Sequence, residues 1–189
     1  MERRNKKKLI NLPRDTVLLS QDESRFSSEV ARVTSWSKSG SSVVYSGERY
    51  GTSLNCFGSL DLKTGNFISS FHDKGDAKAT IEHFKKVRVS YDKKIPLAFL
   101  IDNASWHKTK DVQDYCKKNK ITLFFLPPYS PEFNPIERVW SFLKSKMRQR
   151  YFKTPKIFKS FVFDFFATLN KTYASKLAKQ CINLIDSQV

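Results

Sequence analysis

Three acidic residues stand where a folded chain could present them to one site. Asp22 follows a short β-prone run, Asp102 ends a continuous apolar run, and Glu137 falls at the start of a helical pattern. Strands that end at one edge of an open sheet bring the residues after them together. Mg²⁺ prefers carboxylate oxygens, and two such ions can clamp the attacking and leaving oxygens of a phosphoryl displacement. The three acids could therefore form one metal site.

Each acid also has an ordinary structural explanation. Asp22 could belong to a turn after a strand, and Asp102 could form an Asx turn with the next residue. Glu137 stands three residues after Asn134, a spacing close to a capping box, in which the glutamate reaches back to the helix start. The neighbouring Glu23 is a second candidate for the first metal ligand.

The first half of the chain predicts a strand, a meander and a helix. Residues 16–19 form a short apolar run that predicts a buried strand, with the first carboxylates at its end. Several β-rich runs broken by turn residues between 30 and 71 predict an antiparallel meander. From Asp76, which suits an N-cap, apolar residues recur at helical spacing as far as Tyr91.

The second half predicts parallel strands and amphipathic helices. The apolar run 96–101 is typical of a strand covered on both faces, and it is followed by a helix over 108–120 and a strand over 121–126. A proline-rich loop leads to Asn134, which suits an N-cap, and an apolar stripe continues from there. Two more helices are predicted, one that Thr154 and Pro155 open and one over about 173–185.

The segments around the second and third acid contain two distinctive motifs. Asp102 begins the run D-N-A-S-W-H, Glu137 lies within P-P-Y-S-P-E-F-N-P-I-E-R-V-W, and 34 residues separate the two acids. With these motifs the chain resembles the DDE-superfamily transposases of bacterial and archaeal insertion sequences related to the mariner elements. Both motifs and the gap of 34 residues are hallmarks of that family, and Asp22 stands where its first acid stands. The resemblance covers roughly residues 15–150.

The resemblance implies a fold and a reaction. The fold is α/β and RNase H-like, with a mixed sheet of an antiparallel meander plus parallel strands, flanked by helices. The reaction is Mg²⁺- or Mn²⁺-dependent cleavage of DNA at the element ends by two ions, followed by attack of the freed 3′-hydroxyl on target DNA. Asp22, Asp102 and Glu137 would be the catalytic metal ligands.

A strong positive charge supports a nucleic-acid partner. The 34 Lys and Arg residues outnumber 18 Asp and Glu, giving a net charge of +16 and a pI near 9.8. No acid lies between Arg138 and residue 159, and on a helix Lys144 and Arg148 fall within about 20° of Glu137. We expect Arg138, Lys144 and Arg148 to contact DNA phosphates, although a solvated charged face is also common.

A few further residues in the motifs have expected roles. His107 matches the motif histidine of the family and could orient an acid or contact a phosphate; an ordinary histidine at a helix start is the alternative. Asn103 and Asn134 are expected to shape their loops. Trp106 and Trp140 are expected to pack in the core. For Trp140 the reason is that it lies on the apolar stripe of its helix.

The length of 189 residues predicts one compact unit. We divide it into a basic N-terminal arm (1–14), an RNase H-like catalytic domain (15–150) and C-terminal helices packed on the same domain (151–189). Three scattered cysteines and the absence of a signal peptide or a membrane-spanning stretch predict a reduced, cytoplasmic protein associated with the nucleoid. Family members usually carry an N-terminal helix-turn-helix region, so we expect a separate helix-turn-helix subunit or a missing region, and a homo-oligomer in the transposition complex.

Two other functions compete with a transposase. One is a metal nuclease of the same fold that acts on RNA or structured DNA without strand transfer, and the P-P-Y-S-P motif argues against it. The other is an inactive, DNA-binding remnant of a transposon, an alternative weakened by the presence of all three acids.

Overall fold

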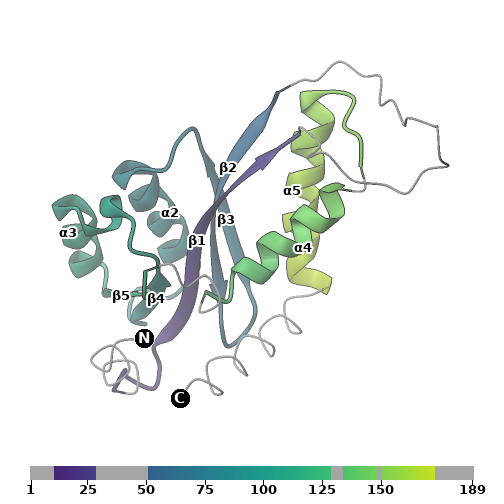
Figure 1. Ribbon diagram of the computed structural model, residues 1–189. Helices are drawn as coiled ribbons and strands as arrows, with labels where there is room; N and C mark the ends of the chain where they lie inside the picture. The colour runs from purple at the N-terminus through teal and green to yellow at the C-terminus, as the bar shows by residue number, and fades with distance from the viewer. Residues whose placement is uncertain (1–10, 29–50, 129–133, 149, 173–189) are drawn as a thin grey trace, which may run out of the picture.

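The computed structural model describes residues 11–28, 51–128, 134–148 and 150–172. A five-stranded mixed sheet has the order β3-β2-β1-β4-β5, and helices flank it (Figure 1). The strands are β1 (Val17–Ser27), β2 (Ser53–Asp61), β3 (Phe67–His72), β4 (Leu97–Ile101) and β5 (Ile121–Phe125). The helices are α2 (Ala77–Val89), the short 3₁₀ helix η1 (Ser105–Lys108), α3 (Lys110–Lys118), α4 (Glu137–Arg148) and α5 (Pro155–Thr172).

The strand pairing has the mixed pattern that the sequence predicts. β1, β2 and β3 pair antiparallel in chain order, whereas β4 pairs parallel with both β1 and β5. The parallel pairs follow from α2 and α3, which carry the chain back to the start of the sheet after β3 and β4. Both the meander and the later parallel strands are therefore confirmed.

The prediction that the first strand ends at the carboxylates is wrong. β1 continues through Asp22 and Glu23 to Ser27 and pairs with β2 from Leu19 to Ser27. This polar stretch can be a strand because β2 satisfies its backbone groups, while Phe26 still buries its ring in the core. Asp22 consequently lies in the middle of a strand instead of in a turn.

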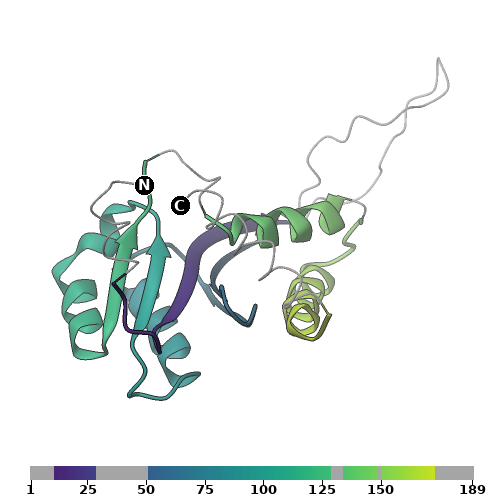
Figure 2. The ribbon, with the colours of Figure 1, turned by 90° about the horizontal axis from the view of Figure 1, so that it is seen from below.

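The sheet is buried on both faces by two separate cores. α4 and α5 cover one face, where Ala98 and Leu100 of β4 point, and α2 and α3 cover the other, where Leu97 and Phe99 point. Both views show α4 and α5 together on the side away from α2 and α3 (Figures 1 and 2). The prediction of a fourth strand buried on both faces is confirmed.

Several local signals in the sequence also have the expected effect. The Asp76 carboxylate accepts a hydrogen bond from the Ala79 N–H at 2.9 Å and caps α2. Gly65 adopts φ 77° in the turn between β2 and β3, a conformation that favours glycine. α5 begins at Pro155, as predicted, and buries Phe158, Val162 and other residues against the core.

Some predicted segments lie outside the described residues. They are residues 1–10 of the basic arm, 29–50 of the meander, 129–133 of the proline-rich loop and the helix over 173–185. Within the described part of the chain, no helix has the length and apolar character that crossing a membrane requires.

Candidate active site

The site lies where β1 and β4 separate. Their last paired residues are Ser20 and Leu100, and β4 ends one residue later, at Ile101. β1 continues past this point without β4 beside it. Extending the parallel register by two residues brings Asp22 level with Asp102. Crevices at the carboxyl ends of strands in open sheets are usual ligand sites, because the strand order changes there.

Asp22 points to the face covered by α4. Its Oδ2 accepts a hydrogen bond from the indole nitrogen of Trp140 at 3.0 Å. Trp140 lies three residues after Glu137, so this bond places the first turn of α4 beside β1. Burial and the negative charges of Glu23 and Glu137 raise the pKa of Asp22 to about 7, while the hydrogen bond from Trp140 opposes the rise. The acids are thus close enough to repel one another.

Buried contacts hold the start of α4 against β1. The Ser20 hydroxyl donates a hydrogen bond to the side-chain oxygen of Asn134, and the backbone N–H of Ile136 donates to the Ser20 oxygen at 3.3 Å. Asn134 therefore ties the chain just before α4 to β1. Trp140 is 1% exposed and packs in the core, as predicted, with ring centroids 5.7 Å from those of Phe26 and of Phe67.

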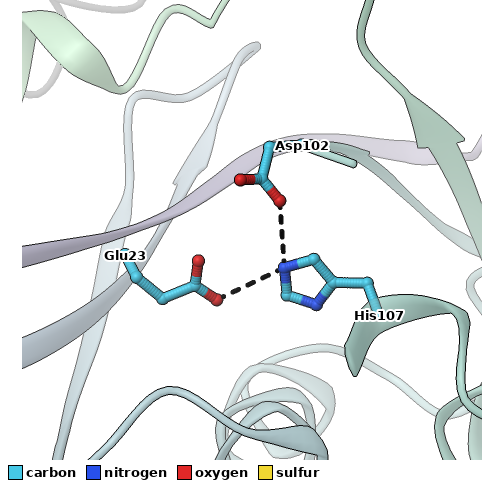
Figure 3. Close-up of side chains that lie close together, drawn as sticks. All are labelled: Glu23, Asp102 and His107. Carbon is cyan, nitrogen blue, oxygen red and sulfur yellow. Dashed lines mark ion pairs between the residues drawn. The ribbon is translucent and has the colours of Figure 1, made fainter. Parts of the chain in front are cut away.

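A second group of side chains gathers on the other side of β1. Figure 3 shows the carboxylates of Glu23 and Asp102 both directed at the same nitrogen of the His107 ring. The Nε2 atom of His107 lies 3.2 Å from Asp102 Oδ1 and 3.5 Å from Glu23 Oε1. One ligand atom from each of the three residues lies within 4.8 Å of the others. These side chains could hold a metal ion.

His107 and Asp102 stabilise each other's charged forms. Burial alone would lower the pKa of His107, but the carboxylates of Asp102 and Glu23 raise it to about 9. The hydrogen bond with His107 is also the main reason why the pKa of Asp102 lies below its usual range. The His107 side chain has no exposed surface, and its Nε2 atom contacts the carboxylates of Asp102 and Glu23.

Hydrogen bonds fix the loop that carries these residues. The Asn103 side-chain nitrogen donates to the carbonyl of Leu126, which ties the end of β4 to the end of β5. Asp102 Oδ1 accepts the N–H of Ala104 at 3.0 Å, and the Gln113 side chain donates to the His107 carbonyl at 3.0 Å. Asn103 therefore shapes its loop, as expected.

From the sequence either Asp22 or Glu23 could be the first metal ligand, and the structure brings both residues to the site. Adjacent residues of a strand point to opposite faces, so Asp22 joins Glu137 while Glu23 joins Asp102 and His107. Gln21, which no motif marks, donates to Glu23 Oε1 at 3.1 Å. Sequence reasoning missed Gln21 because its role depends on pointing to the same face of β1 as Glu23.

The predicted DNA-contacting residues of α4 are exposed. Lys144 and Arg148 lie on the continuous helix that starts at Glu137. At about 100° per residue they lie on the same side of this helix as Glu137. Arg138, the next residue after Glu137, is exposed too. Exposed basic residues therefore lie on the same helix as Glu137.

Comparison with known proteins identifies related sequences. Residues 17–159 match the family model of the DDE superfamily endonucleases. The uncharacterized protein y4pE/y4sA of Sinorhizobium fredii is 38% identical over 41% of this chain and 56% of its own length. The 39 kDa protein of insertion element IS630 from Shigella sonnei is 25% identical over 50% of this chain and 28% of its own length. The Tc3 transposase of Caenorhabditis elegans is 36% identical over 41% of this chain and 23% of its own length. The chain thus spans about half of the first relative and less of the other two.

Solved structures with the same fold include those of the Mos1 transposase. The catalytic domain of Mos1 mariner transposase superposes with a TM-score of 0.66 at 12% identity, covering 97% of this chain and 88% of that one. The mariner Mos1 paired-end complex with Mg gives a TM-score of 0.69 at 14% identity over 94% of this chain and 56% of that one. The sheet described above is therefore the RNase H-like sheet that the sequence predicts.

Proposed function

The chain belongs to the DDE superfamily endonucleases, and from this premise we propose that it is the catalytic part of a DNA transposase. It cleaves DNA at the ends of its element in a metal-dependent reaction and joins the freed 3′-hydroxyl to target DNA. The observation that carries this proposal is the hydrogen bond from Trp140 to Asp22, which holds the first turn of the Glu137 helix beside β1.

Asp22, Asp102 and Glu137 are the proposed ligands of two divalent cations, Mg²⁺ or Mn²⁺. The residues fit such ions because they supply carboxylate oxygens, and because a cation would neutralise the negative charges of Glu23 and Glu137, which together with burial raise the pKa of Asp22. Bound ions of this kind lower the pKa of a water molecule and stabilise the charge that develops on a phosphoryl oxygen. Crystals of the Mos1 mariner paired-end complex with Mg and with Mn support this choice of metal.

The surrounding residues hold the acids in place and bind the DNA. Trp140 fixes the Asp22 carboxylate, and the buried His107 ring fixes that of Asp102. Lys144 and Arg148, with Arg138, would contact phosphates of a DNA strand that passes the first turn of α4. Such contacts give affinity without sequence preference, so recognition of the element ends needs other groups. The proposed partners are the terminal repeats, the target DNA and further copies of the chain.

A cleavage assay tests the proposal. The purified chain is incubated with Mg²⁺ or Mn²⁺, a plasmid that carries the gene with its native flanking sequences, and a helix-turn-helix protein that binds the element ends. We expect cleavage at the element ends and joined products, both lost in Asp102→Asn and retained in Asp114→Asn, which alters an exposed acid of α3. Without the helix-turn-helix protein we expect only weak or unspecific cleavage. Cleavage without joining would indicate a nuclease that lacks strand transfer. DNA binding without cleavage under any of these conditions would indicate an inactive remnant.

A further inference from the structure

We propose that Glu23, Asp102 and His107 form a binding site for a divalent transition-metal ion, with Zn²⁺ and Mn²⁺ preferred over Mg²⁺. The site adds Glu23 and His107 to the ligands proposed above. It rests on the proposed function in one respect, because Asp102 belongs to both ligand sets.

The spacing of the donor atoms suits a metal ion. His107 Nε2 lies 3.2 Å from one carboxylate oxygen and 3.5 Å from the other. Two ligands bound at about 2.0–2.2 Å and roughly 90–110° apart are separated by about 3.0–3.5 Å. The histidine nitrogen therefore lies from each carboxylate at the distance that separates two ligands of one ion, and the three donor atoms all lie within 4.8 Å of one another.

The His107 ring faces both carboxylates from inside the protein. Its side chain is fully buried, Nε2 contacts the carboxylates of Asp102 and Glu23, and Nδ1 makes no hydrogen bond to a described residue. Figure 3 shows Nε2 directed between the two carboxylates. A buried imidazole nitrogen that faces two carboxylates holds either a proton or a metal ion between them. A metal ion that replaces the proton keeps both carboxylates as partners.

Neighbouring groups hold the donors in place before any ion arrives. Gln21 donates to Glu23 Oε1 at 3.1 Å, and the N–H of Ala104 donates to Asp102 Oδ1 at 3.0 Å. Hydrogen bonds of this kind orient the carboxylate ligands of metal sites. Donors already held in position lose little conformational freedom when they bind the ion.

The donor set decides which ion is preferred. Carboxylate oxygens suit Mg²⁺ and Mn²⁺, but an imidazole nitrogen suits Zn²⁺ and other transition metals and contributes little to Mg²⁺. The order of affinities for such mixed sites places Zn²⁺ above Mn²⁺. We therefore expect Zn²⁺ to bind most tightly, then Mn²⁺, with Mg²⁺ weakest.

The test is metal binding by the full chain without DNA, measured by calorimetry with Zn²⁺, Mn²⁺ and Mg²⁺. We expect His107→Gln and Glu23→Gln to weaken Zn²⁺ and Mn²⁺ binding by at least about tenfold, since even outer-shell substitutions cost that much. His107→Gln should also reduce the preference for Zn²⁺ over Mg²⁺. Asp114→Asn, an exposed acid, is the matched control and should change neither.

A second measurement needs no substitution, in case the buried variants fail to fold. Zn²⁺ is titrated into the wild-type chain, and the NMR signals of the His107 ring nitrogens are followed. A large shift of the Nε2 signal at low Zn²⁺ supports the site, whereas an unchanged Nε2 signal, or unchanged affinity in both folded variants, would overturn it. Binding at His107 without DNA cleavage would leave the site standing and reject the transposase. Mg²⁺-dependent cleavage without binding at His107 would reject this metal site and leave the proposed transposase function standing.

Discussion

The indole nitrogen of Trp140 donates a hydrogen bond to Asp22 Oδ2 at 3.0 Å and so joins the helix of Glu137 to the middle of β1. The same ring is 1% exposed and packs on Phe26 and Phe67. One residue therefore serves both the core and the candidate site, which makes the position of Glu137 dependent on core packing.

Replacing Trp140 by Phe should lower both stability and activity. The change removes a hydrogen bond to a half-buried carboxylate, which should reduce the unfolding free energy by about 1.5–3 kcal/mol. It also removes the interaction that opposes the raised pKa of Asp22, so this acid should bind a cation less well at neutral pH. Denaturant unfolding and the cleavage assay measure the two effects. Phe166→Leu trims a ring beside Trp140 and leaves the bond intact, so equal activities in the two variants would contradict the role of this bond.

Replacing Gly58 by Ala tests the same packing from β2. A Cβ atom at this position would lie 2.5 Å from Trp140 Cη2 and 2.7 Å from Phe67 Cζ, which forces the rings to move. We expect the unfolding free energy to fall by about 1–3 kcal/mol, as is typical of overpacked cores, together with weaker cleavage. Gly75→Ala is the matched control, because its nearest neighbour, Trp106 Cζ2, lies at an ordinary 3.6 Å. Equal unfolding free energies for the two variants would show that the space at Gly58 is not limiting.

Folding stability should depend on pH through His83. This ring is fully buried between the hydroxyls of Ser59 and Ser70, at 2.8 and 2.7 Å, and burial lowers its pKa to about 3. In the unfolded chain this histidine has a pKa near 6.5, so as the pH falls it binds a proton before the folded protein does. The unfolding free energy should therefore fall as the pH drops below 6.5 and level off near 3, with a slope of up to about 1.4 kcal/mol per pH unit.

Comparison with His83→Gln isolates this contribution from the other titrating groups. Urea unfolding of both proteins between pH 4 and 7 should give a shallower dependence in the variant. Titration of the His83 ring in the folded wild type near 6.5, followed by NMR, would refute the assignment.

The basic flank of α4 should contribute to DNA affinity in a salt-dependent way. Lys144 and Arg148 are exposed on the helix that begins with Glu137. Charge reversal at both positions should lower the slope of log K against log salt by about 0.9 for each phosphate that the protein no longer neutralises. The same changes at Lys117 and Lys118, exposed on α3, provide the control. An unchanged slope in the variant with both Lys144 and Arg148 reversed in charge would show that DNA does not bind this face of α4.

Hydrophobic patterning and motifs predicted most of the fold, and the failures have physical reasons. The apolar run of β4 and the Asp76 cap are visible in the sequence because burial and capping select residue types. The polar half of β1 is not, because its strand conformation depends on hydrogen bonds to β2, which lies more than twenty residues further along the chain. Tertiary pairing overrides local propensity there.

The acids of the candidate site could be predicted from the sequence, but which of them lie together could not. The motifs contain Asp102, Glu137 and His107, but the direction of each side chain depends on strand register. Because Asp22 and Glu23 are adjacent in one strand, a shift of a single residue would exchange their faces. No sequence pattern fixes that choice.

The most direct test is a crystal structure of the protein grown with Mn²⁺, in which anomalous scattering locates the ions. We predict an ion within bonding distance of Asp102 together with Asp22 or Glu137. Ordered carboxylates of Asp22 and Glu137 without any ion beside them, in crystals that bind Mn²⁺ elsewhere, would contradict the proposed catalytic site.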